Sequence, residues 1–417
     1  MAWEVSDFMA SPQPLQVAIV GAGIGGLSAA LALRAQGHYI KIFEANRAET
    51  GVGISVQTNA MRVLQAYGVS RENLRGVPFD GFLVYNAKTG EDPIAWPWRT
   101  EAEVPGVRSL FCHRNDLHRE LKRLAIGEGF GPPAQLYLDT RIVACDPDAG
   151  SITLATGETI HADLVVGADG INSVMRASVV GRPVQLRSQG LSCFRCLFDA
   201  SALPRFPELA WLVQGPLHGA RSVAWRGEGP AFRMLFIYPV RSGTLINIVA
   251  YFTDEEQDKP NWLPTATKQE VLKKFEGFHP KFLRLFDLPI VGPILKWQLK
   301  SVPLLPTWIR GRGALLGDSA HGTLPLLGQG AAIAIEEAGT LGALFPLGTP
   351  RSQVPARLAA YQAIRKGRGE FVNTESVSQA MDPQKRGSLA RSPELQSLMH
   401  DYDTLAATRE YCEAHFG

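Results

Sequence analysis

The fold of this chain is decided by the stretch VAIVGAGIGGLSAALALRA at residues 17–35. Its first four residues are apolar and mostly β-branched, which is typical of a buried parallel strand. The glycine-rich turn that follows opens an apolar helix, and Gly37 ends that helix. Within the turn, Gly21 permits a tight bend, Gly23 lets the backbone approach a pyrophosphate, and Gly26 lets the helix pack closely on the strand. The pattern therefore predicts a nucleotide site at the helix N-terminus, whose unpaired N–H groups face the phosphates.

A second apolar strand, at residues 39–43, ends in Glu44. An acid at this distance from Gly21 accepts hydrogen bonds from an adenosine ribose. Its carboxylate would repel a ribose phosphate, so NADP is disfavoured at this site. FAD and NAD remain equal candidates on this stretch alone.

Two further segments with glycine and aspartate lie far along the chain. The first, HADLVVGADGINSVMR at residues 161–176, contains an apolar strand that ends close to Asp169. The second, GALLGDSAHGTLPLLGQGAAIAIEEA at residues 313–338, contains an apolar strand that ends at Asp318 and continues through a loop into a helix. An open α/β sheet places its ligand-binding groups at the carboxyl ends of such strands. The Asp318 carboxylate there suits the ribityl or pyrophosphate region of a long dinucleotide.

The last of these helices opens with Gly328, Gln329, Gly330 and Ala331. The small residues in this stretch let a ring system come close to the helix N-terminus. The positive end of the helix dipole would stabilise the negative charge that a reduced flavin carries on its pyrimidine side. A nicotinamide becomes neutral on reduction and needs no such stabilisation. The later segments therefore favour FAD.

With these motifs in order, the chain resembles the group A flavoprotein monooxygenases of the para-hydroxybenzoate hydroxylase fold, and within them the salicylate hydroxylase-like branch. The resemblance covers about residues 15 to 380. It includes CHRNDLHREL at residues 112–121, which is similar to the family segment whose arginine, here Arg114, touches the FAD. It also implies that Gly53, in the GVGIS loop, and Ala331 line the flavin. The implied FAD-binding residues are Gly21, Gly23, Gly26, Glu44, Gly53, Arg114, Asp169, Asp318, Gly328, Gln329, Gly330 and Ala331.

The resemblance implies an α/β fold in which a Rossmann-like FAD-binding domain is interleaved with a substrate domain built on a mixed β-sheet. We expect the FAD-binding domain at residues 1–75, 103–180 and 295–350, and the substrate domain at residues 76–102 and 181–294. Residues 351–417 are expected to form a helical C-terminus. Its basic cluster, Arg365, Lys366 and Arg368, is expected to face solvent.

The expected substrate domain contains short strands rich in aromatic residues, most of which should pack in a core. Arg195 interrupts the apolar strand 191–198, and Tyr238 lies in a predicted hairpin at residues 236–252. In related fungal hydroxylases an arginine and a tyrosine at similar places hold a phenolate over the flavin, so the resemblance implies catalytic roles for this pair. The alternative is an arginine at a strand edge and a tyrosine that fills the core. His218 is a further candidate, as a base.

The resemblance also implies the reaction. NAD(P)H acts as a transient co-substrate that reduces the flavin, dioxygen then reacts with it, and the resulting flavin hydroperoxide hydroxylates an aromatic, polycyclic or otherwise electron-rich small molecule. FAD-dependent epoxidation and oxidative dearomatisation of a secondary metabolite are alternatives on the same scaffold. The rival classes are an NAD-dependent dehydrogenase and a non-catalytic flavin-binding protein. A hydrolase is a further rival, because Gly317-Asp318-Ser319 superficially resembles the start of a GDSL-type esterase.

Composition limits the partners. The 417 residues are 45% hydrophobic and 20% charged with a net charge of +2, which gives no electrostatic reason to expect nucleic acid or an anionic membrane. Apolar runs fall short of the roughly 20 residues of a spanning helix, and the N-terminus lacks a secretory pattern. Five scattered cysteines indicate reduced thiols, and the CxxC of Cys193 and Cys196 lies on a strand that points them to opposite faces. We therefore expect a cytoplasmic monomer or homodimer without a metal site.

Overall fold

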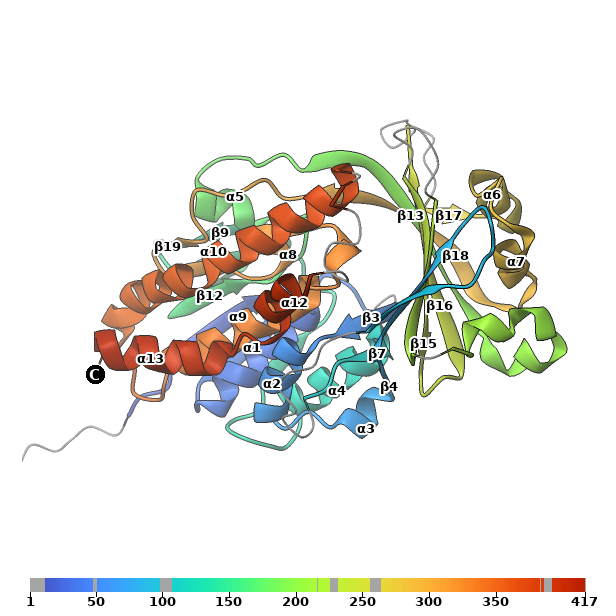
Figure 1. Ribbon diagram of the computed structural model, residues 1–417. Coiled ribbons are helices and arrows are strands. Elements are labelled where there is room, and N and C mark those ends of the chain that lie inside the picture. The colour runs from blue at the N-terminus through green and yellow to red at the C-terminus, as the bar shows by residue number, and fades with distance from the viewer. Residues whose placement is uncertain are drawn as a thin grey trace, which may run out of the picture.

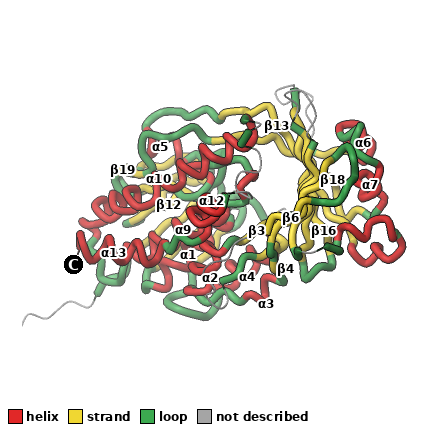
Figure 2. Tube along the Cα trace, viewed as in Figure 1, coloured by secondary structure: helices red, strands yellow, loops and turns green. Residues whose placement is uncertain are grey.

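The computed structural model describes residues 12–47, 51–97, 107–215, 217–225, 232–255, 264–382, 384–385 and 392–416. The chain forms two lobes, one with most of the helices and the other with a large twisted sheet (Figures 1 and 2). No helix within these ranges is both long and apolar enough to cross a bilayer. Residues 1–11, on which the expectation about a secretory leader rests, lie outside the described residues.

The helical lobe is built on the Rossmann-like sheet that the first glycine-rich stretch predicts. Its strands follow the order β19 (Ile309–Arg310), β20 (Gly313–Leu315), β12 (Leu164–Gly167), β1 (Gln16–Val20), β2 (Tyr39–Phe43) and β8 (Gln135–Tyr137). β1 pairs in parallel with β12 and β2, and β12 pairs in parallel with β20. The carboxyl ends of β1, β12 and β20 therefore meet at one edge. α1 (Ile24–Ala35) follows β1 and packs against α9 (Gly330–Leu344).

The second lobe is, among the described residues, an eight-stranded mixed sheet. Its order is β17 (Thr265–Ala266), β18 (Ile290–Ser301), β13 (Arg187–Asp199), β16 (Leu245–Thr253), β15 (Arg233–Val240), β14 (Gly219–Ala224), β5 (Gly81–Asn86) and β6 (Ile94–Pro97). β15 and β16 form the predicted hairpin, whose turn holds Arg241 and Ser242 at φ of 51° and 54°. The helices α6 (Lys268–Lys274) and α7 (Pro280–Leu283) cover the outer face, away from the helical lobe (Figure 1).

A small sheet lies between the two lobes (Figure 1). It pairs β7 (Leu110–His113) with β3 (Gly53–Val56) on one side and with β4 (Val77–Pro78) on the other. α2 (Thr58–Ala66) follows β3, α3 (Arg71–Leu74) precedes β4, and α4 (Arg114–Ile126) follows β7. A peripheral sheet of β9 (Ile142–Asp146), β10 (Ser151–Leu154) and β11 (Thr159–His161) precedes β12, which is followed by α5 (Met175–Val180).

Strand pairing moves two predicted domain boundaries. β18 pairs with β13 along its length as far as Ser301, so the substrate sheet continues past the predicted boundary at residue 294. β4 pairs with β7 rather than with the large sheet, so the substrate lobe begins at Gly81 and not at residue 76. Both errors arise because a sequence shows where a strand is, but not which sheet supplies its partner.

The C-terminal helices are α10 (Val354–Met381), α12 (Pro393–His400) and α13 (Thr404–Phe416). The prediction that the basic cluster on α10 faces solvent is wrong. Arg365 is fully buried and forms an ion pair with the buried Glu336 of α9, and Arg368 Nε binds the same carboxylate at 2.7 Å. Lys366 is partly exposed and binds Glu370 at 2.7 Å. Residues three apart share a helix face, so Arg365 and Arg368 point together at α9 while Lys366 turns away.

Arg365→Met should destabilise the fold by about 3 kcal/mol, because it leaves the buried Glu336 carboxylate with fewer cationic partners. Lys366→Met, one residue along the same helix, is the matched control and should change stability by less than about 0.5 kcal/mol. Denaturant unfolding of both variants measures the difference. Equal unfolding midpoints for the two variants would contradict the buried ion pair.

Candidate active site

A cavity of about 590 Å³ lies between the two lobes. We call its two sides the loop wall, from the strand ends of the Rossmann sheet together with the starts of α1, α4 and α9, and the sheet wall, from the inner face of the large sheet. The loop wall includes Gly23, Ile24, Gly25, Arg114, Ala168, Gly170, Leu316, Gly317, Asp318, Gly328, Gly330 and Ala331. The sheet wall includes Cys193, Arg195, Met234, Phe236, Tyr238, Val249, Tyr251, Trp297 and Leu299. Each motif predicted from the sequence thus contributes to one continuous space.

The first turn of α1 is shaped for a phosphate. Gly21 has φ of 101°, and a Cβ at this position or at Gly26 would collide with a backbone oxygen, of Ala168 and of Gly21 respectively. A Cβ at Gly23 would meet nothing within 4 Å, because the residue faces the cavity. α1 has no side-chain cap and no acid in its first turn. Its N–H groups therefore remain available to an anion, and this turn fits a pyrophosphate.

The side chains of Glu44 and Asp169 both bind backbone N–H groups and do not face the cavity. Glu44 Oε2 accepts the N–H of Ala22 at 2.8 Å, which fixes the glycine-rich turn. Asp169 Oδ2 accepts the N–H groups of Val174 and Met175 at 2.8 and 3.1 Å, which fixes the start of α5. Burial raises the pKa of Asp169, whose Oδ1 has no partner among the described residues. The predicted ligand contacts of these two acids therefore stay predictions, and the contacts seen are to the loops.

Asp318 projects into the cavity from the start of the short helix α8 (Asp318–His321). Desolvation raises the pKa of its carboxyl, and the positive charges of His321 and Arg114 oppose that rise. Beneath it, Glu337 of α9 accepts the Gly317 N–H at 2.7 Å and contacts His321 Nε2 at 2.7 Å. Burial alone would lower the pKa of His321, but the Glu337 carboxylate raises it. This pair fixes the loop that presents Asp318, whose oxygens would accept hydrogen bonds from ligand hydroxyls.

The N-terminus of α9 also opens on the cavity. A Cβ at Gly330 would meet nothing within 4 Å, so a flat ring system has room to approach. Gly328 and Ala331 line the cavity as predicted, but the Gln329 side chain does not. It is buried on the opposite side, where its Oε1 accepts a hydrogen bond from Asn59 at 3.1 Å. The Gln329 side chain is thus turned away from the cavity, and the predicted role of this residue in cofactor binding stays a prediction.

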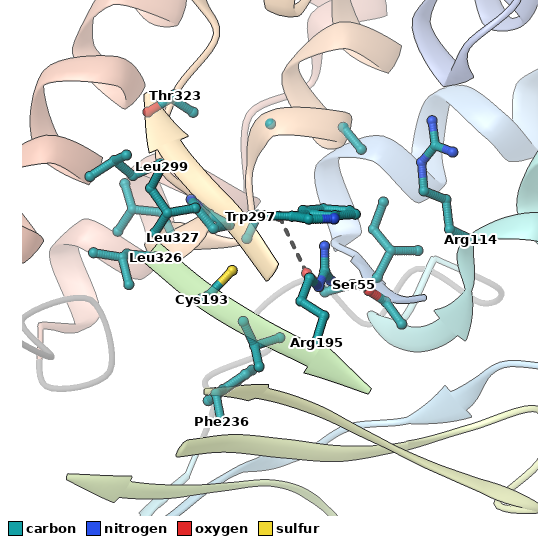
Figure 3. Close-up of a pocket in the computed structure, with 18 of the residues that line it drawn as sticks. Ser55, Arg114, Cys193, Arg195, Phe236, Trp297, Leu299, Thr323, Leu326 and Leu327 are labelled. Carbon is teal, nitrogen blue, oxygen red and sulfur yellow. Dashed lines mark hydrogen bonds between the residues drawn. The ribbon is translucent and has the colours of Figure 1, made fainter. Parts of the chain in front are cut away.

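Arg114 and Gly53 both lie at the small sheet, Gly53 at the start of β3 and Arg114 directly after β7. Arg114 begins α4, its N–H donates to the Val52 carbonyl at 2.8 Å, and its side chain reaches the loop wall (Figure 3). Gly53 lines the cavity at the start of β3. The structure therefore brings both residues to the cavity, and their predicted contacts with the flavin stay predictions.

The sheet wall carries Arg195 among apolar and aromatic side chains. Arg195 and Cys193 rise from β13 toward Trp297, and the guanidinium lies 4.6 Å from the centre of that indole ring (Figure 3). Arg195 Nη2 donates to the Gly53 carbonyl at 2.7 Å, and its buried Nε has no partner among the residues that the structure describes. The Tyr238 ring stacks on the Phe111 ring, with 4.3 Å between the two ring centroids. Burial raises the pKa of Tyr238 to about 12, against the lowering effect of the Arg195 charge.

Two further sequence candidates have no place in the site. His218 is exposed and lies outside the cavity lining, which removes it as a base. Ser319 is fully buried, and its hydroxyl bonds to the carbonyls of Gly167 and Leu316, so the esterase interpretation fails. Cys193 and Cys196 pack in different hydrophobic clusters on opposite faces of β13, as predicted. The described residues contain no group of ligands that could hold a metal ion.

Sequence reasoning missed Trp297, Tyr251 and Asn247. Trp297 and Tyr251 both flank Cys193 across the sheet and line the cavity. Asn247 is fully buried in β16, and its Oδ1 accepts the Gly53 N–H at 2.7 Å. A polar residue within the apolar run of β16 was the available clue to Asn247. The aromatic residues carry no such clue, because rings on strands usually serve the core.

Comparison with known proteins gives consistent results. A family model for an FAD binding domain matches residues 14–376. Hispidin-3-hydroxylase from Neonothopanus nambi is 41% identical over 411 residues, 96% of each chain. Salicylate hydroxylase from Pseudomonas putida is 30% identical over 385 residues, 87% of this chain and 84% of that protein. A solved salicylate hydroxylase substrate complex has a TM-score of 0.74 at 28% identity, with 95% of this chain and 97% of that chain covered.

A Rossmann sheet and two open helix N-termini on one cavity, with an aromatic sheet wall opposite, define the class of FAD-dependent monooxygenases. The chain belongs to the FAD-binding monooxygenase family, in its salicylate hydroxylase-like branch. The choice between FAD and NAD that Glu44 left open is thereby made for FAD, and the dehydrogenase interpretation is excluded. NAD(P)H is the co-substrate typical of this family.

Asp318→Ala should weaken FAD binding by roughly thirtyfold, because a hydrogen bond to a charged group contributes about 2 kcal/mol. The measurement is titration of the apoprotein with FAD, followed by flavin fluorescence. Asp287→Ala, at an exposed ion pair with Lys268 on the outer side of the large sheet, is the control and should bind FAD normally. Wild-type affinity in the Asp318 variant would remove this carboxylate from the flavin site.

Proposed function

We propose that this chain hydroxylates an aromatic small molecule that carries an ionisable hydroxyl or carboxyl group, with dioxygen as the second substrate. The observation that carries the proposal is a single cavity with the FAD motifs on one wall and Arg195 on the facing wall. A substrate bound against the sheet wall would therefore stand directly opposite the flavin ring.

Bound FAD would supply the redox chemistry, accepting hydride from NAD(P)H and activating dioxygen. The residues present fit this group, because Gly23 and Gly330 leave open space where a pyrophosphate and a ring would lie. The N-terminus of α9 points its positive dipole end at that ring position and favours negative charge there. The chain itself contributes binding, orientation and exclusion of water.

Arg195 is the residue we assign to the substrate oxygen. Its guanidinium is half-buried and oriented by Trp297 and by the Gly53 carbonyl. The buried Nε has no partner in the described ranges, so the group has donor capacity left for a ligand. A fixed cation favours the ionised form of a phenol, which raises electron density on the ring carbons that attack an electrophilic oxygen.

Tyr238 and Cys193 accompany Arg195 as neutral groups. Burial holds the pKa of each near 12, so both remain protonated at physiological pH. Tyr238 can donate a hydrogen bond to a substrate oxygen but cannot act as a base. Around them the sheet wall also presents apolar side chains, which would exclude water from the reacting atoms. The apolar members are Met234, Phe236, Val249 and Leu299.

A panel of aromatic acids and phenols tests this function. Hispidin, salicylate and 3-hydroxybenzoate are the first compounds, because relatives are named for hydroxylating them. At least one compound should stimulate NAD(P)H oxidation and yield a hydroxylated product, identified by mass and NMR. FAD binding without stimulation of NAD(P)H oxidation by any acidic aromatic compound would contradict the proposed substrate class.

Arg195→Met keeps an apolar stem over Trp297 but removes the guanidinium. FAD should still copurify, whereas substrate-stimulated turnover should fall by at least about a hundredfold, because the charged hydrogen bond to the substrate is lost. Lys300→Met removes a cation elsewhere on the cavity lining and is the comparison variant. Equal losses in the two variants, or none in Arg195→Met, would remove Arg195 from the substrate site.

Tyr238→Phe should lower kcat/KM by a factor that stays constant from pH 6 to pH 10. The reason is that burial raises the pKa of Tyr238 to about 12, so its hydroxyl stays protonated across this range. Parallel pH profiles of wild type and variant measure the factor. A ratio that changes with a midpoint inside the range would show that the tyrosine ionises during turnover.

A further inference from the structure

Both backbone polar groups of Gly53, its N–H and its carbonyl, form hydrogen bonds with side chains of the large sheet. The Gly53 N–H donates to Asn247 Oδ1 at 2.7 Å, and the Gly53 carbonyl accepts from Arg195 Nη2 at 2.7 Å. Asn247 lies on β16 and Arg195 on β13, both in the large sheet. Gly53 opens β3 of the small sheet, so this one residue is a hydrogen-bonded junction between the lobes.

Asn247 is an unusual residue for its position. It is fully buried, and it pairs across the sheet with Leu197 on one side and Tyr238 on the other. Its Nδ2 is buried and has no partner within the described part of the chain, so the amide leaves a donor unsatisfied in an apolar sheet. An aliphatic residue would pack there without that penalty. What Asn247 provides in return is the oxygen that binds Gly53.

The junction is tight enough to require glycine. A Cβ at Gly53 would lie 2.6 Å from both Asn247 Cγ and Tyr238 Cε2, which is closer than side-chain atoms approach. β3 therefore packs closely against the large sheet. Two hydrogen bonds join them, one donated by the Gly53 N–H and one accepted by the Gly53 carbonyl. This arrangement fixes both the position and the orientation of the strand.

From Gly53 the contacts lead to the flavin end of the cavity. Ser55, further along β3, donates to the Gly328 carbonyl at 3.3 Å in the loop before α9. On the other side of the junction, the Val52 carbonyl accepts the N–H of Arg114 at 2.8 Å. Two parts of the loop wall therefore take their positions from β3.

We propose that Asn247 is a positioning residue of this monooxygenase. Together with Arg195 it fixes Gly53, and it thereby sets the position of β3 relative to the flavin. The second part of this proposal rests on the proposed function. A substrate anion and the Gly53 carbonyl share the Arg195 guanidinium, so substrate binding weakens the Arg195 bond to Gly53. Asn247 then holds β3 in place while the substrate occupies Arg195.

Asn247 is the residue to alter, because a change at Arg195 would disturb substrate and junction together. Asn247→Leu keeps the branched shape in a somewhat larger side chain and removes the acceptor, and Asn247→Asp keeps the acceptor oxygen. Ile248→Val, on the same strand but facing the opposite hydrophobic cluster, is the control for general perturbation of β16. All three are compared with wild type for folding by circular dichroism.

The first measurements need no substrate. In Asn247→Leu, the affinity for FAD should fall by about tenfold and amide exchange in segment 51–56 should speed up, because the Gly53 N–H loses its acceptor. Asn247→Asp should recover most of both losses, and Ile248→Val should show neither. Wild-type values in Asn247→Leu, or equal losses in the Leu and Asp variants, would overturn the proposal. If Asn247→Leu does not fold, fast exchange at Gly53 in the wild-type holoenzyme would overturn it.

The second measurement uses the best compound from the aromatic panel. Asn247 does not touch the substrate in this arrangement, so Asn247→Leu should lower kcat by about tenfold and change KM by less than about threefold. A variant defect confined to KM would overturn the shared role of Arg195. If no panel compound is turned over, the proposed function fails, while the exchange and FAD measurements still decide the role of Asn247.

Discussion

Close backbone contact between β1, α1 and β12 is the constraint on which the rest of the structure depends. Gly21 and Gly26 leave no room for a Cβ, since backbone oxygens of Ala168 and of Gly21 itself occupy that space. This contact brings the carboxyl ends of β1 and β12 together, and β20 joins them by pairing with β12. Segments from three distant parts of the chain therefore face one space, and the cavity lies where that space meets the large sheet.

The FAD half of the site could be predicted from the sequence because this half requires particular backbone conformations and close backbone contacts. A positive φ or a close approach requires glycine at a fixed place within a short window, and such windows can be read without knowing the fold. The same reasoning predicts ligand contacts for Glu44 and Asp169, and these contacts stay predictions. Their carboxylates occur where the motif requires them, but in the structure they bind the N–H groups of the loops. They shape the nucleotide site through its backbone.

The parts that escaped prediction depend on side-chain partners distant in sequence. The spacing of Arg365 and Arg368 shows that they share a helix face, but not that the face meets Glu336. Asn247 and Gly53 lie on different sheets, and no local pattern links them. Arg195 was found because a charge inside an apolar strand is conspicuous. Its bond to the Gly53 carbonyl became visible only in three dimensions.

Two adjacent glutamates connect the C-terminal helices to the chemistry. Glu336 and Glu337 are about 100° apart around α9, so they face different neighbours. Glu337 holds the Gly317 N–H and His321, while Glu336 binds Arg365 of α10. α9 is thereby fixed on two sides by buried charge. A helix dipole stabilises a developing charge only if the helix end is already in place, because reorientation during the reaction would consume the gain. The C-terminal helices therefore belong to the electrostatics of the flavin site, even though they contribute little of its lining.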